Sequence, residues 1–490
     1  MAEVCRVRSS GTMIVLTLVV AVLSVAGCNG AKQPHIVFIV ADDLGWNDVG
    51  WHNPAMITPT LNRMASEGVI LNSSYVQYLC SPSRTSFMTG YFPYRTGLQH
   101  EVIAAGQPRY LPAHFTTLPE MLGKQGYRTH IVGKWHLGMC NWKYTPTERG
   151  FESFFGYYSG MEFYYNHTRL DGYDFRANKS VALDPTRTYA DYLFVDHALD
   201  IIEKHNPEEP LFLYLPFHLV HVPHEVPARF ENMYSSIQDD YRRIYCGMVS
   251  MLDEAVKNVT DALEKAGLTD NMFLIFTTDN GGPTFNGANN LPLRGAKATY
   301  WEGGTRGAGF VHSKNLLQKT GYTNNGMMHA ADWFPTLLHL AGSKPDSDID
   351  GVNQWDMLST GVDSPRTTFV YNIDNITRAA AIRHGDYKLM VGSPGGWNGW
   401  YPLPKLHAQL KEQLAHDAED VDRQWKPQLY NIKEDPEERH DLSSQMPEMM
   451  KFLQGELEKY RQKEVPPQNA PYDPAGDPTH FGGVWTPGWC

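Results

Sequence analysis

Cysteine is scarce in this chain, with six residues in a sequence of 490. So few cysteines cannot build a disulfide scaffold, and the fold must therefore rest on a hydrophobic core. Hydrophobic residues make up 42% of the sequence and charged residues 20%, which excludes general disorder. The length suits one large α/β domain with a smaller second domain.

Basic residues are in deficit, with 42 Lys and Arg against 54 Asp and Glu and a formal net charge of -12. This balance argues against nucleic acid as a partner, because no basic face is available to displace phosphate counterions. It still allows a sulfated or phosphorylated substrate, which needs only a few local cations.

Long hydrophobic runs are also missing, except near the N-terminus. There the apolar run Met13–Ala26 follows Arg6 and Arg8 and leads into small residues that end at Cys28. The run is short for a bilayer span and suits the core of a cleavable leader. We predict a signal peptide over residues 1–27 and no stable membrane span; a membrane anchor, a buried helix and acylation of Cys28 are the alternatives.

Asn-x-Ser/Thr triplets are present behind this leader, and five of them favour a eukaryotic secretory route. The compartment predicted is lysosomal or extracellular. The candidate glycosylation sites are Asn72, Asn166, Asn178, Asn258 and Asn375.

Short apolar runs alternate with helical patterns through the first two thirds of the chain. The predicted strands are His35–Ala41, Arg128–Val132, Leu211–Pro216 and Met272–Thr277. The predicted helices are Pro59–Gly68, Leu118–Gly126, Tyr189–His205 and about Asp239–Ala266. This order predicts an α/β fold with a largely parallel sheet flanked by helices, and a ligand site at the carboxyl ends of its strands.

The alternation of apolar runs and helical patterns ends near residue 345. This position divides a predicted catalytic domain (34–345) from a smaller predicted C-terminal domain (346–490). Three short segments predict an antiparallel sheet, and Met446–Gln462 predicts a helix. The Pro-, Gly- and Trp-rich tail Val465–Gly488 is either an ordered wrap or a loose end. The charged stretch Lys433–Asp441 is interpreted as a solvated turn, and the glycine-rich Ser393–Trp400 carries no chemical signal. The strand segments are Thr368–Ile373, Ala380–Arg383 and Lys388–Val391.

The most specific pattern is Cys80-Ser81-Pro82-Ser83-Arg84. An isolated cysteine is more often a small buried thiol. Here the five positions resemble the motif by which sulfatases have their cysteine oxidised to formylglycine, whose hydrated aldehyde attacks a sulfate ester. Pro82 suits the first turn of a helix, the N-terminus of that helix favours an anion, and Arg84 would orient the nucleophile.

Two pairs of oxygen-bearing side chains each follow a predicted strand directly. They are Asp42-Asp43 and Asp279-Asn280. A single pair is more often a strand-ending turn or helix cap. Two pairs at the same sheet edge predict a site for a hard divalent cation, with Ca2+ accepting more oxygen ligands in a looser geometry than Mg2+.

Four basic side chains complete the candidate site. Lys134 and Lys297 would bind the sulfate oxygens, because negative charge sits there during transfer. His221 would donate a proton to the leaving group, and His136 would orient the nucleophile. The choice of His221 over two neighbouring histidines rests on a family pattern and not on spacing alone.

Together these motifs resemble the type I, formylglycine-dependent sulfatases. In detail they are similar to animal arylsulfatase B (N-acetylgalactosamine-4-sulfatase) and its arylsulfatase I/J relatives. The resemblance runs from about Pro34 to Gln462, through ADDLGWNDVGWH, CSPSRTSFMTGYFPYRTGLQH, GKWHLGM, DNGG and LRGAKATYWEGGTRG.

The resemblance implies an alkaline-phosphatase-like α/β core, a smaller C-terminal α+β domain, one Ca2+ and a formylglycine (3-oxoalanine) derived from Cys80. It also implies a formylglycine-generating enzyme during maturation and a sulfated small-molecule or glycan substrate. The implied metal ligands are Asp42, Asp43, modified Cys80, Asp279 and Asn280. The implied sulfate-binding residues are Arg84, Lys134, His136, His221 and Lys297.

One departure from the relatives concerns cysteine: the pair that they carry after GLQH is absent here. Outside the leader and Cys80, only Cys140, Cys246 and Cys490 remain. Three is odd, so at most one intrachain disulfide can form and one thiol is free or intermolecular.

The predicted function is hydrolysis of sulfate esters, with sulfated sugars such as N-acetylgalactosamine 4-sulfate among the candidate substrates. Two alternatives stay open. One is a phosphodiesterase-like hydrolase with unmodified Cys80, and the other is a sulfated-glycan-binding pseudoenzyme. The aromatic stretch Phe151–Tyr165 could line a sugar pocket, although core packing is the commoner role of such residues.

Overall fold

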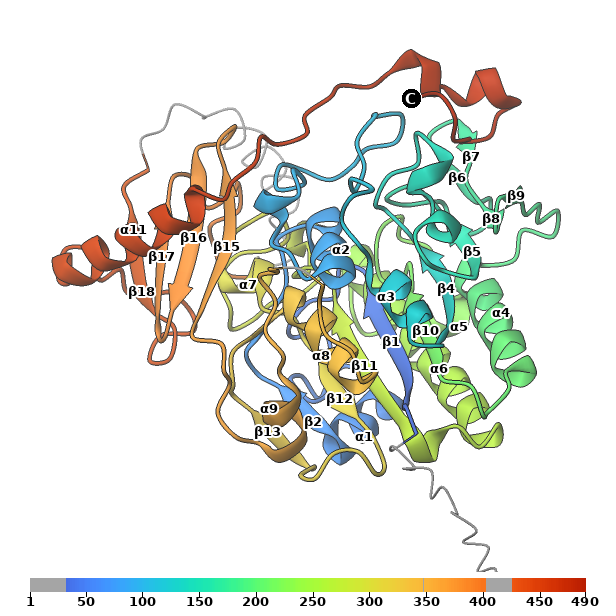
Figure 1. Ribbon diagram of the computed structural model, residues 1–490, viewed down its shortest axis with the longest axis horizontal. Coiled ribbons are helices and arrows are strands. Elements are labelled where there is room, and N and C mark those ends of the chain that lie inside the picture. Colours follow the sequence, from blue (N-terminus) through green and yellow to red (C-terminus); the bar gives the residue numbers. More distant parts are fainter. Residues whose placement is uncertain (1–31, 347, 402–424) are drawn as a thin grey trace, which may run out of the picture. The chain divides into compact units, whose positions relative to one another are not determined.

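A computed structural model describes residues 32–346, 348–401 and 425–490 (Figure 1). The predicted signal peptide, including Cys28, lies outside the described residues. From Gln33 to Cys490 the chain forms one compact unit. The division at residue 345 therefore stays a prediction.

The centre of the unit is a ten-stranded mixed sheet. Its central strands are parallel, and antiparallel pairs occur toward both edges, between β11 and β12, β12 and β2, β5 and β8, and β8 and β9. In spatial order the strands are β13 (Tyr322–Asn324), β2 (Val69–Leu71), β12 (Phe310–His312), β11 (Met272–Thr278), β1 (His35–Ala41), β10 (Leu211–Pro216), β4 (Arg128–Lys134), β5 (Ser153–Tyr157), β8 (Arg176–Ala177) and β9 (Ser180–Val181).

Helices cover both faces of this sheet. They are α1 (Pro59–Glu67), α2 (Cys80–Thr89), α3 (Leu118–Lys124), α4 (Ala190–Lys204), α5 (Ala228–Glu231), α6 (Asp240–Lys265), α7 (Glu302–Thr305), α8 (Trp333–Leu340) and α9 (Trp355–Thr360). The predicted strands and helices of this region agree with the structure to within two residues at each end.

The packing of β1 explains why its sequence is apolar from Ile36 to Ala41. Successive side chains of a strand point to opposite faces of the sheet. Val37 and Ile39 join the core that includes α1, α4 and α6, whereas Ile36 and Phe38 join the core that includes α2, α3 and α8. Both faces are buried, so an alternating polar pattern has no place in this strand.

A second, antiparallel sheet follows in the chain, with α11 (Pro447–Arg461) packed on β15, β16 and β17 (Figure 1). It confirms the predicted small C-terminal sheet and helix. Its core is continuous with Tyr75, Tyr300 and Trp301 from the first part of the chain. Its strands are β15 (Thr368–Asp374), β16 (Ala379–His384), β17 (Tyr387–Val391) and β18 (Gln428–Asn431). Two small two-stranded sheets are formed by β3 (Ser74–Tyr75) with β14 (Met328–His329) and by β6 (Thr168–Arg169) with β7 (Gly172–Tyr173).

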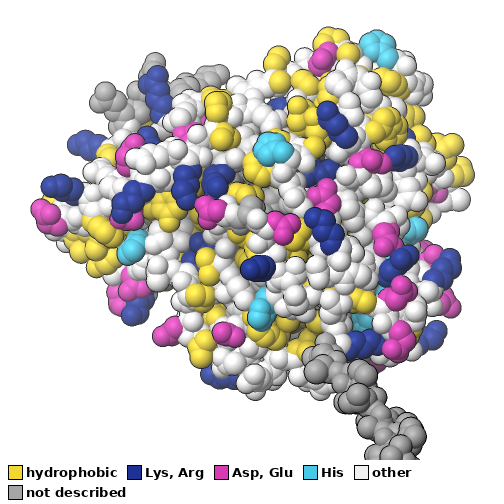
Figure 2. Space-filling model, viewed as in Figure 1, with side chains coloured by type: hydrophobic (Ala, Val, Ile, Leu, Met, Phe, Trp, Pro, Cys, Tyr) yellow, Lys and Arg dark blue, Asp and Glu magenta, His cyan; other side chains and the backbone are white. Residues whose placement is uncertain are grey.

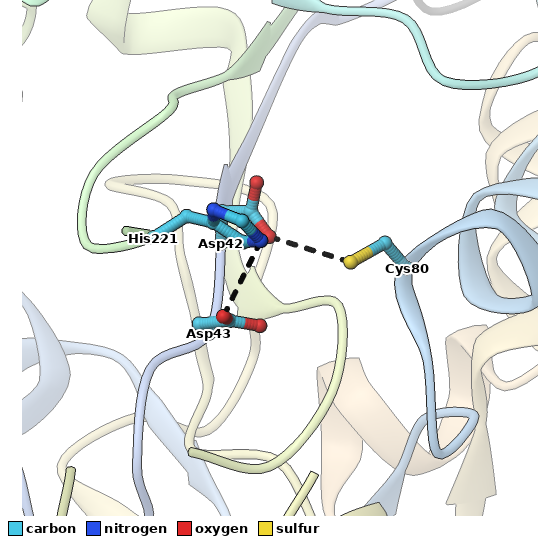
Figure 3. A group of neighbouring side chains, drawn as sticks. All are labelled: Asp42, Asp43, Cys80 and His221. Carbon is cyan, nitrogen blue, oxygen red and sulfur yellow. Dashed lines mark hydrogen bonds and ion pairs between the residues drawn. The ribbon is translucent and has the colours of Figure 1, made fainter. Parts of the chain in front are cut away.

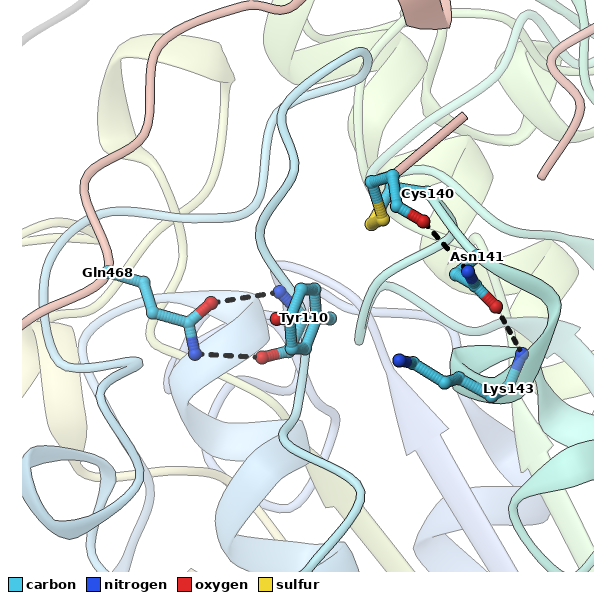
Figure 4. The surroundings of a disulfide bond; sticks show 6 residues. Tyr110, Cys140, Asn141, Lys143 and Gln468 are labelled. Carbon is cyan, nitrogen blue, oxygen red and sulfur yellow. Dashed lines mark hydrogen bonds between the residues drawn. A yellow bond between two sulfur atoms is a disulfide. The ribbon is translucent and has the colours of Figure 1, made fainter. Parts of the chain in front are cut away.

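The C-terminal tail is an ordered wrap. Gln468 makes two hydrogen bonds to the backbone of Tyr110, donating 2.9 Å to its carbonyl and accepting 3.1 Å from its N–H (Figure 4). A disulfide joins Cys490 to Cys140, 350 positions earlier. Cys246 is a free buried thiol, so the limit of one disulfide among these three cysteines is confirmed.

The interpretation of Lys433–Asp441 as a solvated turn is wrong for Glu438. Its side chain is fully buried, and its carboxylate lies 2.7 Å from the Lys388 ammonium. Lys388 in turn lies 3.0 Å from the Glu302 carboxylate. A buried charge is tolerable only when it is paired, and the partners come from segments far away in the sequence.

On the surface, Asn166, Asn178, Asn258 and Asn375 are exposed and Asn72 is half-buried. Acidic and basic side chains are interspersed on the face shown in Figure 2. Within residues 32–346, 348–401 and 425–490, none of the helices combines the length and the apolar character needed to cross a bilayer.

Candidate active site

The carboxylates of the candidate site follow two neighbouring parallel strands. Asp42 and Asp43 follow β1, Asp279 and Asn280 follow β11, and all four are buried. The Asp43 N–H donates to Asp279 Oδ1 at 3.3 Å, and Asn280 Nδ2 donates to Asp43 Oδ1 at 2.7 Å. The predicted oxygen-rich edge therefore exists as one cluster.

Cys80 is the first residue of α2, and its Sγ lies 3.6 Å from Asp42 Oδ1. Every residue of this helix is buried. Gly90 ends the helix in the left-handed conformation, with φ of 72°. The start of α2 is thus fixed against the end of β1, where a nucleophile would face the carboxylates.

Arg84 lies one helical turn after Cys80 and points to the same cluster. Its Nε and Nη2 donate to Asp279 Oδ2 at 3.0 and 2.8 Å, and its Nη1 donates to the Lys134 carbonyl at 3.2 Å. The planar guanidinium is therefore locked by hydrogen bonds on two sides.

Lys134 ends β4, and its Nζ lies 2.5 Å from Asp42 Oδ2 with no exposure to solvent. His136 follows two residues later in a left-handed backbone conformation, with φ of 58°. Its Nε2 lies 2.9 Å from the Ile103 carbonyl. Burial, together with the charges of Lys134 and Arg84, lowers the pKa of His136 well below its usual value.

His221 and Lys297 complete the cluster on its solvent side. The Lys297 ammonium lies 2.6 Å from Asp43 Oδ1, and His221 Nε2 lies 3.6 Å from Asp43 Oδ2. Their side chains are 14% and 11% exposed, whereas those of Lys134 and Arg84 are 0% and 1% exposed. A ligand would therefore enter past His221 and Lys297.

One group of side chains can hold a metal ion: Asp42, Asp43, Cys80 and His221 offer ligand atoms within 4.8 Å of one another (Figure 3). His221 belongs to this group, here called the metal group, although it is expected from the sequence as a proton donor and sulfate-binding residue and not as a metal ligand. Asn280 supports the same place, because its Oδ1 is buried and has no hydrogen-bond partner among the described residues. An orphaned buried acceptor beside carboxylates suits a hard cation.

The charges of the cluster balance before any ligand is added. Without a metal, every cation is paired with a carboxylate of the site. A divalent cation would add two positive charges, and a sulfate dianion would cancel them. The carboxylates are Asp42, Asp43 and Asp279, and the cations are Arg84, Lys134 and Lys297.

Burial also changes the pKa of the candidate nucleophile and of the candidate proton donor. It raises the pKa of the Cys80 thiol to about 12, with the Asp279 charge adding to the effect. It lowers the pKa of His221 well below its usual value, and the charges of Lys297 and Lys134 lower it further. In the ligand-free protein the thiol and the imidazole are therefore both uncharged at neutral pH.

Two buried polar residues next to the site are not predicted from the sequence. Tyr245 on α6 donates from its hydroxyl to the Asp43 carbonyl at 2.9 Å and accepts from Gly45 N–H at 3.1 Å. Asp191 in the first turn of α4 accepts from Leu219 N–H at 3.5 Å, beside the loop of His221. Both lie inside helices that read as ordinary amphipathic segments, so no local signal marks them.

Comparison with known proteins places these features in a family. The sulfatase family model matches residues 34–343. Arylsulfatase J of Mus musculus is 42% identical, covering 94% of this chain and 81% of its own length. Arylsulfatase A of Homo sapiens is 30% identical over 85% of each chain, and N-acetylgalactosamine-6-sulfatase of Homo sapiens is 28% identical over 90% of this chain and 88% of its own.

Solved structures share the fold. The crystal structure of Ps i-CgsB with k-i-k-neocarrahexaose superposes with a TM-score of 0.78 at 25% identity, covering 92% of this chain and 97% of that one. The PsFucS1 sulfatase from Pseudoalteromonas sp. has a TM-score of 0.72 at 22% identity, covering 90% and 92%. The mixed sheet with its smaller antiparallel companion is the α/β sulfatase fold, as predicted. The chain belongs to the sulfatase family and is a sulfuric ester hydrolase similar to arylsulfatase J.

Proposed function

We propose that this enzyme cleaves sulfate esters with a formylglycine formed from Cys80. The observation that carries the proposal is the position of Cys80 at the start of α2, with its Sγ 3.6 Å from Asp42 and three cations around the same carboxylates. The flanking Pro82 and Arg84 complete the Cys-x-Pro-x-Arg pattern. A hydrated formylglycine supplies a hydroxyl nucleophile at that position.

Ca2+ is the proposed metal. Asp42, Asp43, Asp279 and Asn280 would hold it through oxygen atoms, together with residue 80. His221 lies close enough to take part. When bound, the ion supplies positive charge that polarises a sulfate oxygen and favours the ionised nucleophile.

Lys134, Lys297 and Arg84 are the proposed sulfate-binding cations. Each now pairs with a carboxylate of the metal group, so a bound metal would free these cations to donate hydrogen bonds to sulfate oxygens. Because Lys134 and Arg84 are buried, their charge acts in a low-dielectric setting and is little screened by water.

His221 is the proposed donor of a proton to the leaving oxygen. Its imidazole is neutral in the ligand-free protein because of burial and the two lysine charges. A sulfate anion beside Lys134 and Lys297 would offset those charges and raise the pKa of His221, which favours proton uptake once substrate is bound. His136 would hold the nucleophile in place.

The substrate class proposed is sulfated glycans and small aryl sulfates, with N-acetylgalactosamine 4-sulfate as the specific candidate. The motif resemblance to arylsulfatase B supports this candidate. Relatives named N-acetylgalactosamine-6-sulfatase support the sugar but not the 4-position of the sulfate. The proposed location is the lysosome or the extracellular space. The Cys140–Cys490 disulfide supports maturation in an oxidising compartment.

Peptide mass spectrometry across residue 80, on protein secreted from a eukaryotic host, tests the nucleophile. We expect a peptide lighter by the change from CH2SH to CHO and trapped by an aldehyde reagent. Cys80→Ala should reduce release of sulfate from a chromogenic aryl sulfate to background. Cys246→Ala, which removes the other buried free thiol, should remain active.

An unmodified thiol in active protein would contradict the formylglycine proposal. If that protein turned over phosphodiesters faster than sulfate esters, the phosphodiesterase alternative would hold. Tight binding of sulfated glycans without release of sulfate would identify a pseudoenzyme instead.

A further inference from the structure

The glycine-rich segment Ser393–Trp400, which follows β17, lies directly against the loop that carries Lys297. The Tyr300 N–H donates to the Pro394 carbonyl at 2.7 Å, and the Gly295 N–H donates to the Gly399 carbonyl at 2.7 Å. The stretch Gly295–Tyr300, here called the Lys297 loop, is thus held at both ends by one segment of the C-terminal sheet.

The approach between the two segments is closest at Gly395. A Cβ at this position would lie 2.4 Å from the Ala298 carbonyl oxygen and 2.8 Å from the Thr299 Cα. Its φ of +114° is also one that other residues rarely adopt. The absence of a side chain here lets backbone pack on backbone immediately after Lys297.

Arg294, the residue before the Lys297 loop, fastens the two segments together. Its Nη2 donates to Asn398 Oδ1 at 2.8 Å and its Nε to the Asn398 carbonyl at 3.2 Å. Its Nη1 donates to the Glu438 carbonyl at 2.9 Å. The guanidinium also lies over Trp301 at 3.7 Å and Trp400 at 4.9 Å from the ring centres.

The other side of the Lys297 loop rests on the catalytic loops. The Lys297 N–H donates to the Gly282 carbonyl at 3.3 Å, after the Asp279-Asn280 pair. The Ala298 N–H donates to the Tyr78 carbonyl at 2.9 Å, just before Cys80. The place of the Lys297 ammonium is therefore set jointly by the sheet edge and by Ser393–Trp400.

We propose that Arg294, clamped by Asn398 and Trp400, is a positioning residue that fixes Lys297 for sulfate binding, so that the C-terminal sheet sets the affinity of the site. The proposal rests on the proposed role of Lys297 at the sulfate. Arg294 touches no reacting atom; it acts through the Lys297 loop. Lysine cannot replace it, because an ammonium lacks the planar fork that reaches both Asn398 and Glu438 while the cation lies near the Trp301 and Trp400 rings.

The experiment compares Arg294→Lys with Lys297→Ala and with a matched buried arginine, Arg366→Lys, in the full secreted protein. Arg366 is also stacked on an aromatic ring and hydrogen-bonded to Asp332 and two carbonyl oxygens, but it contacts no residue of the site. The readouts are KM and kcat on an aryl sulfate, inhibition by inorganic sulfate, and amide hydrogen exchange of the peptide covering Gly295–Tyr300.

We expect Arg294→Lys to raise KM and the inhibition constant for inorganic sulfate about tenfold or more, since small displacements of a charged group cost this much. Exchange of Gly295–Tyr300 should accelerate. Arg366→Lys should lower the melting temperature without changing KM, the inhibition constant for sulfate or the exchange of Gly295–Tyr300. In the double variant Arg294→Lys/Lys297→Ala, KM and the inhibition constant should match those of Lys297→Ala to within about twofold, because both changes act on sulfate binding by Lys297.

Unchanged exchange of Gly295–Tyr300 in Arg294→Lys would overturn the clamp, and so would additive losses in the double variant. If Lys297→Ala left sulfate inhibition unchanged, the proposed role of Lys297 would fail instead. The hydrogen-exchange result would still decide whether Arg294 holds the loop.

Discussion

Glu438 is a single carboxylate whose surroundings make stability depend on pH. Its Oε1 lies 2.7 Å from the Lys388 ammonium, and its Oε2 accepts from Glu302 N–H at 2.7 Å. Burial raises the pKa of Glu438 to about 7, an effect that Lys388 only partly offsets. For Glu302, the charges of Lys388, Arg383 and Arg306 outweigh burial and lower the pKa to about 2.

The raised pKa predicts that the contribution of Glu438 to stability falls as pH rises. Between the ordinary glutamate value of 4.5 and about 7, the folded state holds a proton on Glu438 that the unfolded state has released. The Glu438 contribution to the free energy of unfolding should therefore fall as pH rises through this window, by about 1–3 kcal/mol. Glu438→Gln should remove this decrease, measured by denaturant unfolding between pH 5 and 8.

The neighbouring Glu437 is the control, because it pairs with Arg439 on the surface. Glu437→Gln should keep the wild-type slope of stability against pH. The same slope in Glu438→Gln would show that another group is responsible. A contribution that favours acidic pH is compatible with the proposed lysosomal location.

At the scale of elements, the tail depends on its covalent attachment. The Cys140–Cys490 disulfide closes a loop of 350 positions, and Asn141 Nδ2 also donates to the Cys490 carbonyl at 2.8 Å. We expect Cys490→Ser to destabilise the protein by about 2–5 kcal/mol. Thermal unfolding with and without a reducing agent checks this, since reduction should bring the wild type down to the variant. Cys246→Ser leaves the Cys140–Cys490 disulfide in place, so reduction should still lower the melting temperature of this variant.

The sequence predicts the central elements well because each is specified locally. An unbroken apolar run of six residues such as Leu211–Pro216 is too short for a typical helix and favours a strand buried on both faces, and β10 occupies this range. The strands β2, β12 and β13, toward one edge of the sheet, span three residues each and are not predicted from the sequence. Strands this short carry too few side chains to show a period, and tertiary packing decides their conformation.

The residues of the candidate site also differ in whether the sequence predicts them. Seven of the ten residues expected at the metal and the sulfate lie at or after the carboxyl ends of β1, β4, β10 and β11, whereas Cys80 and Arg84 lie on α2 and Lys297 lies in a loop. Arg294, Tyr245 and Glu438 are not predicted, because their partners lie from about 50 to about 200 positions away. A pairing across that distance leaves no mark in the local pattern. The roles of the ten residues are proposals for experiment.

At the scale of the whole molecule, the metal group joins separate parts of the chain. Asp42 and Asp43 follow β1, Cys80 begins α2, and His221 lies beyond β10. A ligand that binds only the folded state stabilises it in proportion to the logarithm of its concentration. We predict that Ca2+ added to chelator-treated protein raises the melting temperature, with Mg2+ less effective because it demands a tighter octahedral site.

Asp43→Asn should reduce this calcium-dependent shift. Asp253→Asn is the control: Asp253 is a buried aspartate on α6 that accepts from the Thr60 and Leu61 N–H groups at the start of α1. It should lower the melting temperature but leave the shift produced by Ca2+ intact. Equal loss of the shift in both variants would argue against the assigned ligands.

The Cys140–Cys490 disulfide can form only at the end of translation. Cys140 lies directly after the GKWHLGM motif, and its partner is 350 positions further along. A growing chain on the ribosome therefore carries Cys140 as a thiol while the strands around the active site are already available to fold. Any chain that stops short of position 490 keeps that thiol unpaired in an oxidising compartment, where thiol exchange can capture it. The Cys140–Cys490 bond itself, as distinct from a mixed disulfide at Cys140, therefore forms only after residue 490 has been translated.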